Sequence, residues 1–146
     1  MPSVFDVAAY ILEKCGPISA MKLQKLVYYS QAWSLVWDEE ILFPEKIEAW
    51  ANGPVVRELY DKHRGIFKVS PALVGGDPDL LNPDQKETVD VVCEAYCEMN
   101  AQMLSDLTHG EAPWRNARRG LSDGDRGSNV ISLADMAEYY SSLPPA

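Results

Sequence analysis

The sequence predicts a compact, mainly α-helical single domain of about five to six helices, with a short β-hairpin-like excursion near residues 41–50. Apolar residues make up 47% of the 146 residues, which is enough for a core without disulfide or metal support. Most of them recur at the three- and four-residue spacing of helices. Serine or asparagine precedes several of these runs, and glycine or proline ends them. We expect one domain over residues 1–146, with its core at about residues 4–140.

Two helices are expected at the N-terminal end. Ser3 with Asp6 forms a capping-box-like start, and the apolar run that follows ends at Gly16-Pro17. Ser19 caps a second helix that is rich in aromatic rings, so we expect it to lie deep in the core. Its inner face is formed by Leu23, Leu26, Val27, Ser30, Trp33 and Trp37.

The middle of the chain is expected to be less regular. Two short apolar runs, 41–43 and 47–50, flank Pro44-Glu45-Lys46 and predict the hairpin-like excursion. Asn52-Gly53-Pro54 predicts the start of a third helix, because a first turn tolerates proline. The glycines and prolines of residues 69–82 predict a mobile surface loop. The inner face of the third helix would hold Val55, Val56, Leu59, Tyr60, His63 and Phe67.

The longest helix is expected to begin at Asn82-Pro83. A short basic helix should follow around residues 115–119, and then a loop over residues 120–127. Ser132 with Asp135 predicts a final helix, which Pro144-Pro145 would end. The inner face of the longest helix would hold Val89, Val92, Cys93, Tyr96, Met99, Met103, Leu104 and Leu107.

The acidic residues are unevenly distributed. The net charge is −9, and residues 71–113 carry nine acidic side chains against one basic side chain, Lys86. Such a surface repels phosphates and attracts basic protein surfaces, so the composition disfavours a nucleic-acid partner.

Four carboxylates share the face of the longest helix opposite its apolar residues. A face of this kind is usually only solvated, and a partner-binding surface is the alternative. The arginines that follow would form intramolecular pairs or contact a partner at the rim. The candidate partner-binding residues are Glu87, Asp90, Glu94 and Glu98, together with Arg115, Arg118 and Arg119.

No signature of a catalytic or metal site is present. Cys93 and Cys97 lie one helical turn apart, but a closed metal site needs four ligands, so burial is the better interpretation. His63 is expected to be half-buried and hydrogen-bonded, and His109 to lie at a helix end. We therefore expect no enzyme activity, no cofactor and no metal. A small hydrolase that pairs His109 with Asp106 or Glu111 is the alternative.

The sequence predicts a cytoplasmic protein. No apolar run approaches the roughly 18 residues of a membrane-spanning helix, so we expect no membrane partner. Residues 1–6 contain neither a basic leader nor an apolar signal stretch. The three cysteines lack the dense spacing of a secreted disulfide scaffold.

Three separated blocks of the sequence together resemble a known family. They are MKLQKLVYYSQAW at residues 21–33, EAWANGPVVRELY at residues 48–60 and LSDLTHGEAPW at residues 104–114. In this order they resemble the Panacea domain of toxin–antitoxin pairs, closest to the SocA-type antitoxins, over about residues 4–140. Six residues of these blocks read as core and helix-start positions that define the fold: Leu23, Leu26, Trp33, Gly53, Pro54 and Tyr60.

The resemblance implies an antitoxin whose partner is a cognate toxin protein. For the SocA type it further implies a proteolytic adaptor, which delivers the toxin to the AAA+ protease ClpXP for degradation. An adaptor works by raising the effective concentration of its substrate at the protease, which requires binding surfaces but no chemistry. Simple masking of the toxin is the alternative.

Overall fold

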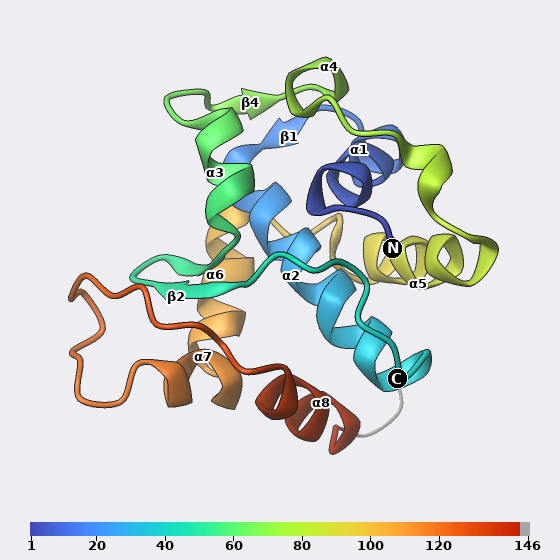
Figure 1. Cartoon of the computed structure of the whole chain (residues 1–146). Coiled ribbons are helices and arrows are strands. Elements are labelled where there is room, and N and C mark those ends of the chain that lie inside the picture. Colours follow the sequence, from blue (N-terminus) through green and yellow to red (C-terminus); the bar gives the residue numbers. More distant parts are fainter. Residues whose placement is uncertain (144–146) are drawn as a thin grey trace.

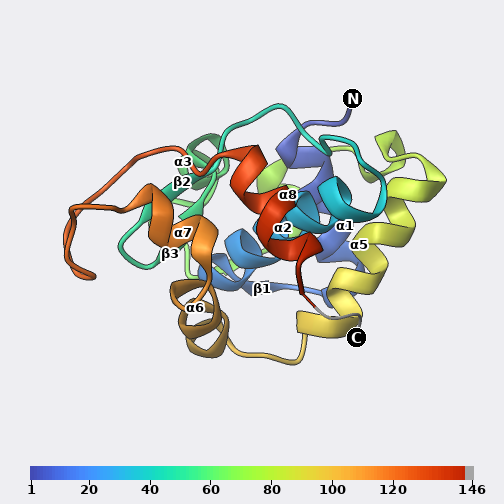
Figure 2. The ribbon, with the colours of Figure 1, turned by 90° about the horizontal axis from the view of Figure 1, so that it is seen from below.

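The computed structural model describes residues 1–143 and is organised around one central helix, α2 (Ala20–Trp37). Helices α1 (Val4–Cys15), α5 (Pro83–Tyr96) and α8 (Leu133–Ser141) pack against it, as Figures 1 and 2 show from two directions. The predicted fold class, a mainly α-helical protein with a small hairpin, is confirmed. The other elements are β1 (Ile18–Ser19), β2 (Glu48–Trp50), β3 (Gly53–Val55), α3 (Arg57–His63), β4 (Lys68–Val69), α4 (Pro71–Val74), the 3-10 turn η1 (Pro78–Leu80), α6 (Ala101–His109) and α7 (Ala112–Ala117).

Helix α2 is buried on nearly all sides, so it also buries polar side chains. The carboxylate of Glu111 illustrates how they are accommodated, because the hydroxyls of Tyr29 and Tyr140 donate to it at 2.7 and 2.8 Å. Burial raises the pKa of Glu111 although these two hydrogen bonds act against the shift. The ring-rich face of α2 lies in the core as predicted, except that Trp37 is 47% exposed.

The helix starts that depend on local capping are confirmed. Ser3 and Asp6 form a complete capping box, and Ser19 accepts from the amide of Lys22. Asn82 forms a second capping box with Gln85, and Ser132 accepts from the amide of Asp135. The stop predicted at Pro144-Pro145 lies outside the described residues.

The predicted hairpin is displaced along the chain. Its two strands are β2 and β3, which pair antiparallel with Trp50 opposite Gly53, so the run 41–43 is not a strand. Helix α3 consequently begins at Arg57, and the prediction that Gly53-Pro54 starts it is wrong. The apolar run 41–43 instead packs beside α2, where the amide of Gln31 bonds Leu42 N and Phe43 O.

The predicted longest helix is two helices. It ends near Tyr96, and α6 starts anew after Asn100, whose side chain accepts from the amide of Met103. The change of direction takes Met103 out of the core, so it is 50% exposed and not on the predicted inner face.

Residues 69–82 are not the irregular loop that the glycines and prolines suggested. Strands β1 and β4 pair antiparallel, with Ile18 opposite Val69, and α4 and η1 follow β4 in the chain. The carboxylate of Asp6 accepts from the amide of Asp77 at 2.8 Å, which attaches the segment to α1.

Gly76 is expected to be essential for this attachment. A Cβ at position 76 would lie 2.1 Å from the carbonyl oxygen of Phe5, which is backbone that cannot rotate away. The variant Gly76→Ala should therefore lose roughly 1–3 kcal/mol of unfolding free energy in urea melts. Gly124→Ala is the matched control, because a Cβ there meets nothing within 4 Å. Equal stability of the two variants would contradict the close approach.

Candidate functional site

A cavity of about 910 Å³ opens where the first turns of α2 meet the β2–β3 hairpin, α3 and residues 64–67. Residues 126–128 close another side. We call it the Lys25 cavity, and its lining includes Met21, Gln24, Lys25, Trp50, Tyr60 and Phe67. Ligand sites are typically concavities of this size with a few convergent polar groups, so this cavity is the candidate functional site.

Lys25 is the unusual residue of the cavity. Its side chain is only 1% exposed, and within residues 1–143 no hydrogen bond or ion pair reaches its ammonium group. Burial lowers the pKa of Lys25 to about 8, since the protein interior solvates a charge poorly. Lysine is rarely buried without a partner, so this group needs an explanation.

Gly53 makes room for Lys25. The lysine chain runs against the hairpin so closely that a Cβ at position 53 would lie 2.6 Å from Lys25 Cε. The φ angle of Gly53 is +130°, a conformation that side-chain-bearing residues rarely adopt. Position 53 therefore favours glycine for two reasons, the φ angle of the hairpin turn and the close packing of the Lys25 side chain against it.

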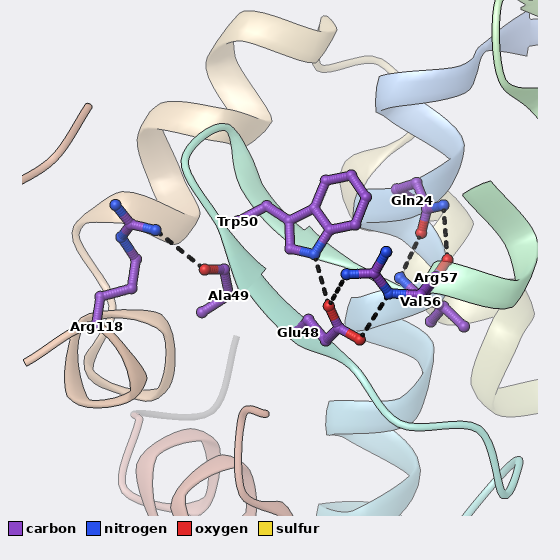
Figure 3. Close-up of polar contacts among 7 residues, drawn as sticks. All are labelled: Gln24, Glu48, Ala49, Trp50, Val56, Arg57 and Arg118. Atoms are coloured by element: carbon purple, nitrogen blue, oxygen red, sulfur yellow. Dashed lines mark hydrogen bonds and ion pairs between the residues drawn. The ribbon is translucent and has the colours of Figure 1, made fainter. Parts of the chain in front are cut away.

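Gln24 fixes the wall next to Lys25. Its Oε1 accepts from Val56 N at 2.9 Å, and its Nε2 donates to Val56 O at 3.3 Å, which Figure 3 shows as a pair of bonds. The same amide lies 2.9 Å from Nε2 of His63. Burial lowers the pKa of His63, so the ring is neutral and accepts this bond. One side chain thus holds α2, the start of α3 and His63 together.

Glu48 organises the hairpin side of the site. It accepts from Trp50 Nε1 at 2.9 Å and from two nitrogens of Arg57 at 2.9 and 3.2 Å (Figure 3). Partial burial alone would raise the pKa of Glu48, but these hydrogen bonds lower it. The guanidinium of Arg57 also lies over the Trp50 ring, 5.2 Å from its centroid.

The rim of the cavity is apolar and cationic. Phe67 is 82% exposed, and Met21 and Ile66 are also well exposed beside it. Among residues 1–143, the lining contains four cationic residues, Lys25, Arg57, Arg64 and Arg126, and no aspartate or glutamate. In a chain of net charge −9, this concentration of positive charge is unexpected.

The predicted carboxylate face is not uniform. Glu87 and Glu94 are exposed on α5, whereas Asp90 accepts from Tyr10 Oη at 2.7 Å and pairs with Lys14 at 3.7 Å. Glu98 is exposed beyond the end of α5. One of the four carboxylates therefore already serves the contact between α1 and α5.

The three predicted arginines have different environments. Arg115 and Arg119 are exposed, but Arg118 is 4% exposed and stacks on Trp114. Its guanidinium donates to the carbonyl oxygens of four residues: Ala49, Ser122, Asp123 and Asp125. Figures 1 and 2 place α7 and α5 on opposite sides of α2, so the arginines do not lie beside the carboxylate face. Whether any of these residues contacts a partner stays a prediction.

Within residues 1–143, His109 makes no hydrogen bond to Asp106 or Glu111, the two carboxylates of the alternative hydrolase site. His109 lies at the end of α6 and stacks on Trp114, with ring centroids 4.1 Å apart. Its Nε2 is buried without a hydrogen-bond partner within the described part of the chain. Asp106 accepts from Gln102, and Glu111 is held by two tyrosines, so neither carboxylate orients His109. His63 is buried and hydrogen-bonded, as expected.

The cysteines are free thiols, and only Cys93 is fully buried. The contact with Cys93 and then burial raise the pKa of Cys15, whereas burial and then the contact with Cys15 raise the pKa of Cys97. Within residues 1–143 no group of three or more metal-ligating side chains could hold an ion. Nor does any helix of that range have the length and hydropathy to cross a membrane.

Two of the three sequence blocks line the cavity and the third contacts one of them beside it, an arrangement that the sequence interpretation missed. Leu23, Leu26, Gly53 and Pro54 are buried, as expected for core positions. Lys25 and Tyr60, from the same blocks, line the cavity, and Thr108 of the third block lies beside Gly53. The available signal was a lysine within a helix whose aliphatic and aromatic residues occupy more than one face, because a lysine in such a helix has little solvated surface to reach.

The sequence model of one protein family matches residues 23–115, and its description is Antitoxin SocA-like, Panacea domain. The matched range includes Lys25, the β2–β3 hairpin and α3, which form most of the cavity wall. The corresponding comparisons with curated proteins and with solved structures gave no match.

Proposed function

The chain belongs to the SocA-like Panacea domain family, and from this we propose that it is an antitoxin that binds a cognate toxin protein and delivers it to the ClpXP protease. The family assignment supports the antitoxin role. Toxin binding and delivery are the proposal.

The Lys25 cavity supports binding as the mode of action. It is a cavity of about 910 Å³, and exposed aromatic and aliphatic side chains line its rim. Interface anchors are typically such residues around a desolvated centre. His63 accepts a bond from Gln24 and so has a structural role in the cavity wall, which is compatible with a binding surface.

Genetic dependence tests the antitoxin role. Deleting the gene for this chain should arrest growth only when the neighbouring toxin gene is intact, and deleting both should restore growth. A single deletion without effect in a strain that expresses the toxin would contradict the proposal.

Delivery and masking predict different fates for the toxin. Purified toxin, antitoxin, ClpXP and ATP are mixed, and both proteins are followed over time. Under delivery the toxin disappears while the antitoxin persists, because a tether acts repeatedly. Masking instead leaves a stable complex with both proteins intact, which would remove the protease from the proposal.

A further inference from the structure

Lys25 has the properties of a cation prepared for an absent anion. Lys25 is 1% exposed, its ammonium has no hydrogen bond or ion pair within residues 1–143, and among those residues the lining of the adjoining cavity holds no carboxylate. A buried charge is costly unless it is paired. No ion pair among the described residues involves this ammonium, and the neighbouring Gly53 and Thr108 supply no negative charge.

We propose that the Lys25 cavity receives an acidic segment of the toxin, and that one side-chain carboxylate of this segment pairs with Lys25 Nζ. The inference rests on the proposed function, because it identifies the chemistry of the toxin segment that the antitoxin recognises.

The energetics favour this occupant. An ion pair normally has to overcome the loss of water from both charges, but Lys25, which is 1% exposed, has already lost most of its water on folding. The incoming carboxylate therefore meets a preorganised charge in a medium of low dielectric constant.

The rim identifies a segment, not an isolated anion. Arg64 and Arg126 are exposed and have no ion pair among the described residues, so they can receive further carboxylates. Met21, Ile66 and Phe67 offer apolar surface between these charges. A single phosphate or a chain terminus would pair with one cation and leave the apolar rim uncovered. A segment of alternating acidic and apolar residues would instead pair with several cations and cover the apolar rim.

The pairing makes binding depend on pH. The groups that face Lys25 are Arg57, Tyr60 and His63 from α3 and His109 from α6. Both histidines have pKa values below 6.5, and Arg57 stays charged, so these three do not change charge above neutral pH. Lys25 loses its proton near pH 8, so affinity should fall about tenfold between pH 7 and about pH 9.

A peptide probe tests the site without the toxin. The probe is an acetylated, amidated hexapeptide of alternating glutamate and leucine, and the control peptide carries glutamine in place of glutamate. In NMR titrations the acidic peptide should shift the Lys25 Nζ and Trp50 indole signals and raise the pKa of Lys25, with the loss of affinity at high pH described above. Lys25→Met should lower the affinity for the acidic peptide at least tenfold. Lys14→Met, an exposed charge on α1, should not change it, and Tyr60→Phe should keep the pH dependence.

Equal binding of the two peptides would overturn the inference, as would unchanged binding to a folded Lys25→Met variant. Stronger shifts with inorganic phosphate than with the acidic peptide would overturn it in favour of a phosphate site. A toxin that binds wild type and Lys25→Met equally would refute the inference and leave the proposed function standing. Binding of the acidic peptide without any binding of the toxin would refute the proposed function instead.

Discussion

Replacing Lys25 with methionine should make the free protein more stable by about 2–3 kcal/mol at neutral pH while it abolishes recognition of an acidic partner. The pKa of Lys25 falls from 10.5 to about 8 on folding, which corresponds to an unfavourable free energy of about 3 kcal/mol for keeping the ammonium charged. Methionine keeps the unbranched stem that lies against Gly53 and removes only the charge.

Urea denaturation at two pH values checks this expectation. The unfolded lysine keeps its proton up to about pH 10.5 and the folded one only to about pH 8, so the unfolded state binds more protons in this window. Stability of the wild type should therefore rise between pH 7 and about pH 9, and that of Lys25→Met should rise less. Lys14→Met loses the same charge from an exposed position and should retain the rise. A less stable Lys25→Met would show that the ammonium has a stabilising partner.

Replacing Arg118 with methionine should cost roughly 2–4 kcal/mol of stability and weaken the cavity wall at residues 126–128. The guanidinium bonds the carbonyl of Ala49 in the hairpin and three carbonyls of residues 122–125, at distances of 2.6 to 3.3 Å. Hydrogen bonds from a charged donor contribute about 1.5–3 kcal/mol each, and the exposed loop carbonyls recover part of this from water. The methionine stem keeps the packing on Trp114.

The matched control for this prediction is Arg119→Met, which removes the same charge from the next residue. Arg119 is exposed and makes only a 3.5 Å contact with Asn116, so its loss should change stability by less than about 0.5 kcal/mol. Hydrogen exchange of the amides at residues 121–128 should accelerate in Arg118→Met and stay unchanged in Arg119→Met. Similar behaviour of the two variants would mean that Arg118 does not hold the loop.

Helix starts were predictable because their determinants lie within four residues of one another. Ser3 with Asp6 and Asn82 with Gln85 complete their bonds without help from distant parts of the chain. The break between α5 and α6 was not predicted, because the apolar spacing continues across Asn100 although that residue caps a new helix. Periodicity alone does not reveal that a helix has turned.

The hairpin and the cavity depend on non-local pairing. Pro54 is compatible with a first helical turn, and only the pairing of β3 with β2 decides against it. Lys25 lines a cavity because the hairpin, α3 and α6 approach α2 from different parts of the sequence. The blocks contain the cavity residues Lys25 and Tyr60, which the sequence interpretation did not single out as a binding surface, and the partner-binding role it gave to the charges near α5 and α7 stays a prediction.

The close approach of Lys25 and Gly53 also constrains how such a protein can evolve. Lysine 25 can be replaced while glycine 53 remains, because a shorter or neutral side chain still fits beside the hairpin. Gly53 is constrained more strongly, since its φ of +130° strains any side chain at position 53 whether or not a lysine lies beside it. Relatives are therefore expected to keep the glycine more widely than the lysine, and a relative that keeps the glycine but has lost the lysine is expected to bind a different partner.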